Sequence, residues 1–440
     1  MSEQAFVLFY LTKKLPIMFC FDRMGLIFAS ITTLVWILCG IYSFAYFKGD
    51  KKAKRYTVFY VITLFVILSL DFAGNLITFY LFYELMTLLS VPLVFHNETK
   101  EAIMAALKYL FYSLCGAYMA LFGLYFVFQN AETISFMPGG VLASSVTPQN
   151  QTILLIAILS MILGFSVKGG MLPMHAWLTS AHPVAPAPAS AFLSGIIVKG
   201  GVLGIIRTIF YIASPDLIRG TFVQTVLLIL SIATIFLGSM LAYREKVFKK
   251  RLAYSTVSQV SYILFGIFLL NPLSLTGSLL HVIFHATIKS ALFLCAGIVI
   301  HETGKERVDE LSGIGKQMPG MLAAFAVVSM GLVGIPPLSG FISKWYLCVG
   351  SLNEAIPVYS YLGPAMLLVS ALLTAGYLLP IVIKGYIPGK DWNAEGVQKI
   401  HVSAWMMIPV VILALLTILL GVFPGKLIEL FKALAETLVS

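Results

Sequence analysis

The sequence predicts an all-α membrane protein with about twelve transmembrane helices, and three observations support this fold class. The chain has 440 residues, of which 59% are hydrophobic and only 11% charged, and its mean hydropathy is +0.95. Its apolar segments are long enough to cross a bilayer, which takes a helix of roughly 20 residues. Two of the segments are interrupted by glycine and proline. This composition excludes a soluble globular domain.

The predicted spans follow one another with short polar connections. They lie near residues 24–47, 56–72, 74–95, 101–128, 151–172, 186–213, 221–243, 251–270, 275–301, 319–347, 360–386 and 403–424. Residues 5–20 form a further apolar element, but Lys13, Lys14 and Pro16 argue against a full span. The N-terminus carries Glu3 and no basic region, so we expect no cleaved signal peptide.

Basic residues are distributed unequally between the two sets of alternating loops. One side holds Lys48, Lys51, Lys52, Lys54, Arg55, Lys100, Arg244, Lys246, Lys249, Lys250, Arg251, Lys305, Arg307, Lys316, Lys390 and Lys399. The other side holds Lys13, Lys14, Arg23, Arg219, Lys426 and Lys432. The positive-inside rule places the first set in the cytoplasm and both termini outside. The net charge of +10 is therefore a signal of topology and gives no reason to expect nucleic acid as a partner.

Two spans should be broken inside the membrane. One break is predicted at Gly169, Gly170 and Pro173, and the other at Pro336 and Pro337. Proline removes a backbone donor and clashes with the preceding turn. Non-helical backbone occurs at membrane depth where it is buried in protein or lines a cavity.

Breaks in two spans that lie five helices apart are the pattern of inverted repeats. We place the repeats at residues 56–213 and 221–386. Residues 1–55 are then an N-terminal segment with one span, and residues 387–440 are a last span with an amphipathic tail, which could lie on the membrane surface or against a partner. The alternative to repeats is that prolines are simply common in transmembrane helices.

Five lysines and one glutamate lie within these apolar spans: Glu84, Lys108, Lys168, Lys199, Lys289 and Lys344. A charged side chain at the bilayer centre costs about 2.5–3.5 kcal/mol on insertion scales. Movement of charge across the membrane is the simplest reason to retain so many charged side chains within the spans. Lys108, Arg207 and Lys384 lie nearer to span ends, where a long basic side chain can snorkel to the interface, and Asp71 is expected at the interface.

His281, His285 and Lys289 are spaced four residues apart and share one helix face. Such a ladder of titratable groups suits proton relay, although a single intramembrane histidine is often only a structural hydrogen-bond donor. Glu84 must be either protonated or paired. A lysine partner makes two protonation states possible, and a static ion pair is the alternative.

No metal, cofactor or catalytic site is indicated. The five cysteines lie far apart, and no CxxC or Cys/His ligand spacing occurs. The helix expected from Arg251, RLAYSTVSQVSYI, carries hydroxyls and amides that can hold water between lysines or can bond helices together.

Five stretches together resemble the antiporter-type subunits shared by respiratory complex I, Mrp cation/proton antiporters and membrane-bound hydrogenases. They are LFYELMTLLSVPLV, VKGGMLPMHAWLTSAHPVAPAPASAFLSG, RLAYSTVSQVSYI, HVIFHATIKSALFLCAG and GIPPLSGFISKW. The resemblance covers almost all of residues 21–424. It differs from typical members, which have fourteen spans, because the first two spans have no counterpart and no long lateral helix follows at the C-terminus.

The resemblance implies roles for individual residues. Glu84 and Lys168 would form the family's glutamate–lysine pair, and Lys199 its connecting lysine. His285 and Lys289 would be the central pair, and Lys344 the terminal residue of the broken helix. A lysine at the position of Lys108 also occurs in part of the family. A hydrated polar axis near the membrane midplane would join these groups.

This resemblance favours an ion-translocating subunit of a multi-subunit membrane oxidoreductase, hydrogenase-like or complex I-like, in the cytoplasmic membrane of a prokaryote. Other membrane subunits would be its partners, and H⁺, alone or with Na⁺, its substrate. The alternative is a subunit of a redox-free Mrp-type Na⁺/H⁺ antiporter. An independent enzyme is not expected, because the chain has no cofactor motif.

Overall fold

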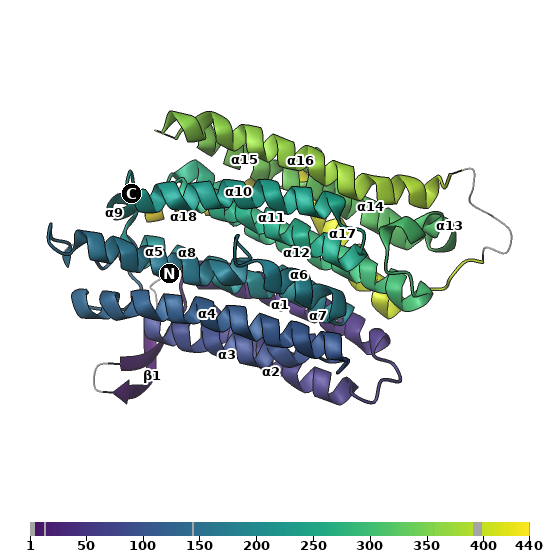
Figure 1. The fold of residues 1–440 in the computed structure, drawn as a ribbon, viewed down its shortest axis with the longest axis horizontal. Coiled ribbons are helices and arrows are strands. Elements are labelled where there is room, and N and C mark those ends of the chain that lie inside the picture. The colour runs from purple at the N-terminus through teal and green to yellow at the C-terminus, as the bar shows by residue number, and fades with distance from the viewer. Residues whose placement is uncertain (1–4, 13–14, 143–144, 355, 390–397, 440) are drawn as a thin grey trace.

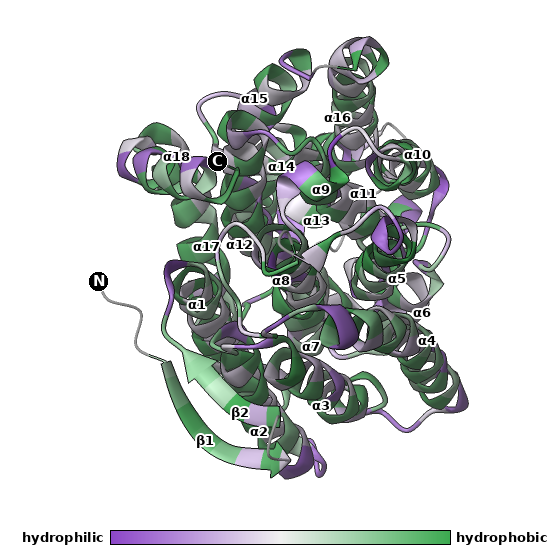
Figure 2. Ribbon diagram, turned by 90° about the vertical axis from the view of Figure 1, so that its left-hand side faces the viewer, coloured by the Kyte–Doolittle hydropathy of each residue, from purple (hydrophilic) through white to green (hydrophobic). Residues whose placement is uncertain are grey.

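The computed structural model describes the chain except for residues 1–4, 13–14, 143–144, 355, 390–397 and 440. The expectations that rest on Glu3, Lys13, Lys14 and Lys390 therefore lie outside the described residues. Most of the long helices run roughly parallel to one another and form a bundle (Figure 1). Seen end on, α8, α11 and α12 lie inside this bundle, surrounded by the other helices (Figure 2).

The first half of the chain contains a hairpin, the helices before the first break and the helices that follow it as far as α9. Its elements are β1 (Ala5–Thr12), β2 (Leu15–Cys20), α1 (Arg23–Tyr46), α2 (Ala53–Asp71), α3 (Leu76–Val94), α4 (Lys100–Asn130), α5 (Gln151–Gly169), α6 (Ala176–Val184), α7 (Ala187–Phe192), η2 (Leu193–Ile197), α8 (Val198–Arg207), η3 (Thr208–Ala213) and α9 (Pro215–Ile218).

The second half contains α10 (Phe222–Arg244), α11 (Phe248–Phe268), α12 (Pro272–Thr303), η4 (Val308–Leu311), α13 (Ile314–Gln317), α14 (Pro319–Val333), α15 (Ser339–Leu352), α16 (Pro357–Tyr386), α17 (Ala404–Val422) and α18 (Gly425–Val439). The assignment of the two halves as inverted repeats stays a prediction.

The predicted membrane fold is confirmed. Among the described residues, ten helices are long and apolar enough to cross a bilayer, counting residues 187–213 as one. The polar helix α11 and the broken pair α14 and α15 correspond to the other two predicted spans. The second and third predicted spans are separated where α2 ends at Asp71 and Asn75 caps α3 by accepting a hydrogen bond from the Thr78 amide at 2.8 Å.

The apolar element at residues 5–20 is a β-hairpin and not a helix. β1 pairs antiparallel with β2, with Ala5 opposite Cys20 and Thr12 opposite Leu15. The hairpin is fixed to the turn between α2 and α3, because the Asn75 side chain donates to the Pro16 carbonyl at 2.8 Å and the Gly74 amide to the Met18 carbonyl at 2.8 Å. Strand pairing and these two contacts therefore satisfy part of its backbone without a membrane-spanning helix.

Helices near the centre of the bundle are covered on all sides. Every residue from 187 to 213 is buried, as are nearly all residues of α11 and α12. The outer helices instead expose apolar side chains such as Phe44, Phe111 and Leu372. Charged and hydroxyl side chains on the central helices consequently face protein and not lipid.

The basic loops that the sequence placed on one side gather at one end of the bundle. Lys52 forms an ion pair with Glu98, joining the α1–α2 loop to the α3–α4 loop. The Phe248 amide donates to the Glu306 carbonyl at 2.8 Å and joins the α10–α11 loop to the segment after α12. α9 lies at the opposite end (Figure 1). The orientation of these ends across the membrane stays a prediction.

The amphipathic tail is helical, as its spacing predicted, and it packs on this chain's own bundle. Phe431, Leu434, Ala435 and Leu438 of α18 are buried, and the helix lies against α12. Its apolar face is therefore largely used within the molecule, which leaves little of it for a partner.

The predicted snorkelling of Arg207 is wrong, and Asp71, at the end of α2, is buried within the protein. Arg207 is 1% exposed and forms a buried ion pair with Asp22, and Asp71 is 2% exposed and accepts a hydrogen bond from Thr32 at 3.3 Å. The Arg207 guanidinium also lies 4.6 Å from the centre of the Tyr211 ring. Snorkelling failed as an interpretation because it requires a clear path to the interface, and the surrounding helices close that path.

Glycines set the spacing of α4 and α5. A Cβ atom on Gly116 would lie 2.6 Å from the Gly164 carbonyl oxygen, and one on Gly164 would lie 2.4 Å from that of Gly116. Close helix contacts of this kind depend on residues without side chains. The same two helices carry Ser113 and Lys168, so their separation also sets the geometry around that lysine.

We expect Gly164→Ala to force α4 and α5 apart, to destabilise the protein by about 1–3 kcal/mol and to lower activity by displacing Ser113 from Lys168. Thermal unfolding in detergent measures the first effect and transport assays the second. Gly425→Ala is the matched control, because no atom lies within 4 Å of a Cβ placed there. Equal melting temperatures for the two variants would contradict the prediction.

Candidate functional site

Lys168 lies in the last turn of α5, just before the first helix break. Its side chain is fully buried. The ammonium group donates to Thr87 Oγ1 at 2.7 Å, to the Tyr109 hydroxyl at 3.0 Å and to Ser113 Oγ at 3.0 Å. These three acceptors use all the hydrogen-bonding capacity of an ammonium group. The three hydroxyls can therefore hold a protonated amine without a water ligand.

The helix break supports this position. Gly170 ends α5 in the left-handed conformation, with φ of 74°, which glycine adopts without strain. Carbonyls at the end of a helix lack partners within it, and the indole of Trp177 in α6 donates to the Val167 carbonyl at 2.7 Å. Trp177 also stacks on Tyr109, with 4.5 Å between ring centres.

Glu84 does not contact Lys168 directly. The carboxylate is half-buried on α3, one turn before Thr87, and its Oε1 atom has no hydrogen-bond partner among the described residues. It still interacts electrostatically with Lys168. Hydroxyls of α3 and α4 occupy the hydrogen-bonding positions around the Lys168 amine. The Glu84 carboxylate of the expected pair therefore lies nearby without bonding to the amine.

Lys199 links the first half of the chain to the second. Its Nζ atom lies 2.6 Å from His285 Nδ1 of α12 and donates to the Ser194 carbonyl at 2.9 Å. Ser194 belongs to the π-helical turn η2, a distortion that is frequent at functional sites. Gly201 follows Lys199 by two residues, and a Cβ atom placed on it would lie 2.8 Å from Lys168 Cβ. Glycine at this position therefore lets α8 lie directly against α5.

Lys289 is bound by α11. Its ammonium group donates to the Leu252 carbonyl at 2.9 Å and also contacts Ser255 Oγ. The Thr256 hydroxyl lies 2.7 Å from that of Ser194, whereas Ser258 bonds to helices α10 and α16. The polar helix therefore bonds neighbouring helices together and contacts Lys289 directly, whereas water held between lysines stays a prediction.

His281 and Lys344 lie at the second break. They complete a series of buried amines and imidazoles, which we call the buried line: Lys168, Lys199, His285, Lys289, His281 and Lys344. His281 Nδ1 lies 2.8 Å from Ser343 Oγ, and its ring centre lies 5.9 Å from that of His285. Lys344 donates to the carbonyls of Leu332 and Val333 at 2.7 and 2.8 Å. These carbonyls end α14, where the helix dipole favours a cation.

Lys108 is placed apart from these groups. Its side chain is exposed on the outer face of α4, beside a shallow groove lined by Leu107, Phe111 and Val184. It makes no hydrogen bond or ion pair with the described residues. Its position fits the snorkelling alternative and not membership of the buried line, because residue 108 falls on the outward face of its helix.

Two buried groups were missed from the sequence. His182 in α6 stacks on Phe293, with 4.6 Å between ring centres, and Lys249 donates to the Ala185 carbonyl at 2.7 Å. Lys249 was counted as a loop residue, but α11 begins at Phe248, before the expected start. Its spacing of seven residues from Thr256 places both on one helix face, which is a signal that the sequence contained.

Several buried polar atoms along the line have no hydrogen-bond partner among the described protein groups. They belong to Tyr83, Glu84, His175, His182, Gln259, His281, His285, Ser329 and Ser339. An unsatisfied buried polar group costs about 1–3 kcal/mol, and bound water ordinarily serves such groups. The line is therefore chemically suited to hydration between its amines and imidazoles.

The fold and this line of groups define the class of protein: an ion-transporting, multi-pass membrane protein with buried amines and imidazoles between broken helices. The chain belongs to the NADH:quinone oxidoreductase/Mrp antiporter transmembrane family, whose model matches residues 73–374. The family resemblance seen in the sequence motifs is thereby confirmed.

Known relatives include subunits of an oxidoreductase and of a Na(+)/H(+) antiporter. The chain is 29% identical over 404 residues to NADH-quinone oxidoreductase subunit N of Desulforudis audaxviator, covering 88% of this chain and 78% of the relative. It is 30% identical over 404 residues to a Na(+)/H(+) antiporter subunit of Alkalihalophilus pseudofirmus, covering 91% and 78%. A chain in the structure of the Mrp complex from Dietzia sp. has the same fold, with a TM-score of 0.87 and 23% identity over 100% of this chain and 88% of that one.

Proposed function

We propose that this chain is the ion-translocating, antiporter-like subunit of a multi-subunit membrane-bound oxidoreductase, hydrogenase-like or complex I-like. Other subunits would perform the redox chemistry, and this chain would move protons or exchange them for Na⁺. The observation that carries the proposal is the buried line from Lys168 through Lys199 and His285 to Lys344. The oxidoreductase subunit among its relatives supports the same assignment.

The contacts suggest how protons would move. At 2.6 Å, either Lys199 or His285 can hold the proton of their shared hydrogen bond. Lys168 would hold its proton while Glu84 is ionised and release it when that negative charge is neutralised. His182 and Lys249 extend the line from Lys289 toward the basic end of the bundle. Water would connect the groups that do not touch.

The location and partners follow the same proposal. The chain would lie in the cytoplasmic membrane of a prokaryote with the basic end inside and both termini outside. Neighbouring membrane subunits would bind it within the bilayer. It would hold no cofactor or metal of its own and would bind no nucleic acid.

A redox-free Mrp-type antiporter is the second candidate, favoured by the relative that is a Na(+)/H(+) antiporter subunit. The partners of the purified complex distinguish the two candidates. Subunits with iron–sulfur clusters favour the oxidoreductase, and small multi-span subunits without redox centres favour the antiporter.

Separate measurements of pH and Na⁺ gradients in vesicles containing the purified complex test the proposed transport. We expect a transmembrane gradient of at least one of these ions when the complex is energised by its electron donor. An ionophore for that ion should abolish the gradient. Electron transfer without any ion gradient in sealed vesicles would contradict the proposal.

A further inference from the structure

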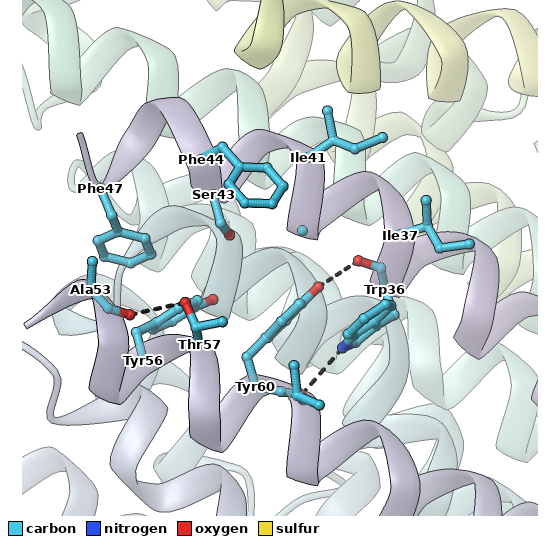
Figure 3. Close-up of a pocket in the computed structure, with 12 residues that line it drawn as sticks. Trp36, Ile37, Ile41, Ser43, Phe44, Phe47, Ala53, Tyr56, Thr57 and Tyr60 are labelled. Carbon is cyan, nitrogen blue, oxygen red and sulfur yellow. Dashed lines mark hydrogen bonds between the residues drawn. The ribbon is translucent and has the colours of Figure 1, made fainter.

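An apolar groove lies between α1 and α2, away from the buried line (Figure 3). It has a volume of about 390 Å³. Its lining residues are Trp36, Ile37, Gly40, Ile41, Ser43, Phe44, Phe47, Ala53, Tyr56, Thr57, Tyr60 and Val61. Ile37 and Phe44 are 46% and 76% exposed, so the groove opens on the outer surface of the bundle.

The polar side chains of the groove are largely satisfied within the protein. Trp36 donates to the Tyr60 carbonyl at 3.2 Å and Tyr60 to the Trp36 carbonyl at 2.7 Å, and both bonds are seen in Figure 3. Ser43 and Thr57 donate to carbonyls within their own helices. The remaining surface suits a hydrocarbon chain. Tyr56 lies at the end of the groove near the α1–α2 loop.

The dimensions fit one acyl chain. The groove follows α1 from Trp36 to Phe47, a rise of about 16 Å at 1.5 Å per residue. Half of a bilayer's hydrocarbon core is about 15 Å thick. The occupant that fits is therefore a lipid tail from the leaflet at the loop end.

The loop at this end carries an excess of positive charge. Glu98 accepts hydrogen bonds from Lys52 and Arg55, which lower its pKa to about 2, and a hydrogen bond to His96 lowers the pKa of Asp50 below its usual range. Both acids are thus ionised and already paired at neutral pH.

The three remaining lysines of the loop are uncompensated. Lys48, Lys51 and Lys54 are exposed and make no ion pair with the described residues. They flank Phe47 and Ala53, the residues that line the loop end of the groove. Basic clusters next to a membrane helix attract anionic headgroups.

From these observations we propose that the α1–α2 groove and its basic loop bind an anionic phospholipid. Its phosphate would contact Lys48, Lys51 and Lys54, and one acyl chain would lie in the groove against Trp36 and Tyr60. The proposal is independent of which ion the protein transports.

Native mass spectrometry of the delipidated complex, titrated with dioleoylphosphatidylglycerol or dioleoylphosphatidylcholine, tests the proposal. We expect phosphatidylglycerol to bind at least tenfold more tightly. Lys48→Gln, Lys51→Gln and Lys54→Gln combined should weaken phosphatidylglycerol binding at least tenfold. The matched control is Lys246→Gln, Lys305→Gln and Lys316→Gln combined, which removes three charges at the same end, two of them exposed and one half-buried.

A second variant tests the groove itself. Gly40→Leu places a side chain in the groove and should reduce binding of both lipids, and the lysine variant decides the proposal if Gly40→Leu does not fold. Equal affinity for the two lipids, or equal losses in the two triple variants, would overturn it. So would a neighbouring subunit's helix crosslinked to a cysteine introduced at Ile37.

Discussion

Replacing Lys168 by methionine is expected to abolish ion translocation, to the background of empty vesicles, while the complex still assembles. Methionine retains most of the buried volume but carries no proton. Replacing a buried charge by an apolar group of similar size is often neutral for stability. Thr87, Tyr109 and Ser113 lose one bond each, and Tyr109 keeps its contact with Ser90 at 2.8 Å. Gradient formation in vesicles and size-exclusion chromatography measure the two effects.

Three further variants test whether loss of transport is specific to the charges of the proposed site. Lys168→Ala and Glu84→Ala should give the same loss, because both groups belong to the proposed translocation site. Lys316→Ala is the control, since Lys316 is an exposed lysine at the basic end of the bundle. Normal vectorial transport in both Lys168→Ala and Glu84→Ala would rule out a role in transport for the charges of these two residues.

Arg207→Met is expected to destabilise the protein by about 3–5 kcal/mol, because it leaves the Asp22 carboxylate buried without its partner. Asp22 is 5% exposed and accepts hydrogen bonds from both terminal nitrogens of Arg207. It also caps α1 by accepting from the Gly25 amide at 2.8 Å. Unfolding of the purified protein in mixed micelles measures the change in the free energy of unfolding.

A double-variant cycle separates the ion pair from simple loss of packing. Asp22→Asn keeps a good helix cap and removes the charge, so adding it to Arg207→Met should restore part of the lost stability. Arg244→Met is the control at an exposed arginine and should change stability by less than about 0.5 kcal/mol. If Asp22→Asn brings no recovery in the Arg207→Met background, the loss comes from packing alone.

The spans and the helix breaks were accessible from the sequence, because both depend on local physics. About 20 apolar residues are needed to cross a bilayer wherever they occur, and Gly170 and Pro173 interrupt a helix regardless of its neighbours. The ladder of His281, His285 and Lys289 was likewise readable, since one helix holds all three.

Exposure and partners were less predictable, because they depend on which helices become neighbours. The outward position of Lys108 and the burial of Arg207 are both decided by the faces that adjacent helices cover. The burial of Lys249 was missed for a related reason. In the sequence, a basic residue at the start of a helix resembles a loop residue until the surrounding helices are known.

The sequence by itself determined a multi-pass helical protein of the antiporter-like family, with lysines and histidines inside its spans, because hydropathy, proline and charge act along the chain. Only the tertiary structure decided which of these groups meet. Lys199 reaches His285 across 86 residues of sequence, and hydroxyls from two other helices surround Lys168. Side-chain contacts between distant segments depend on how whole helices pack, and no local pattern specifies that.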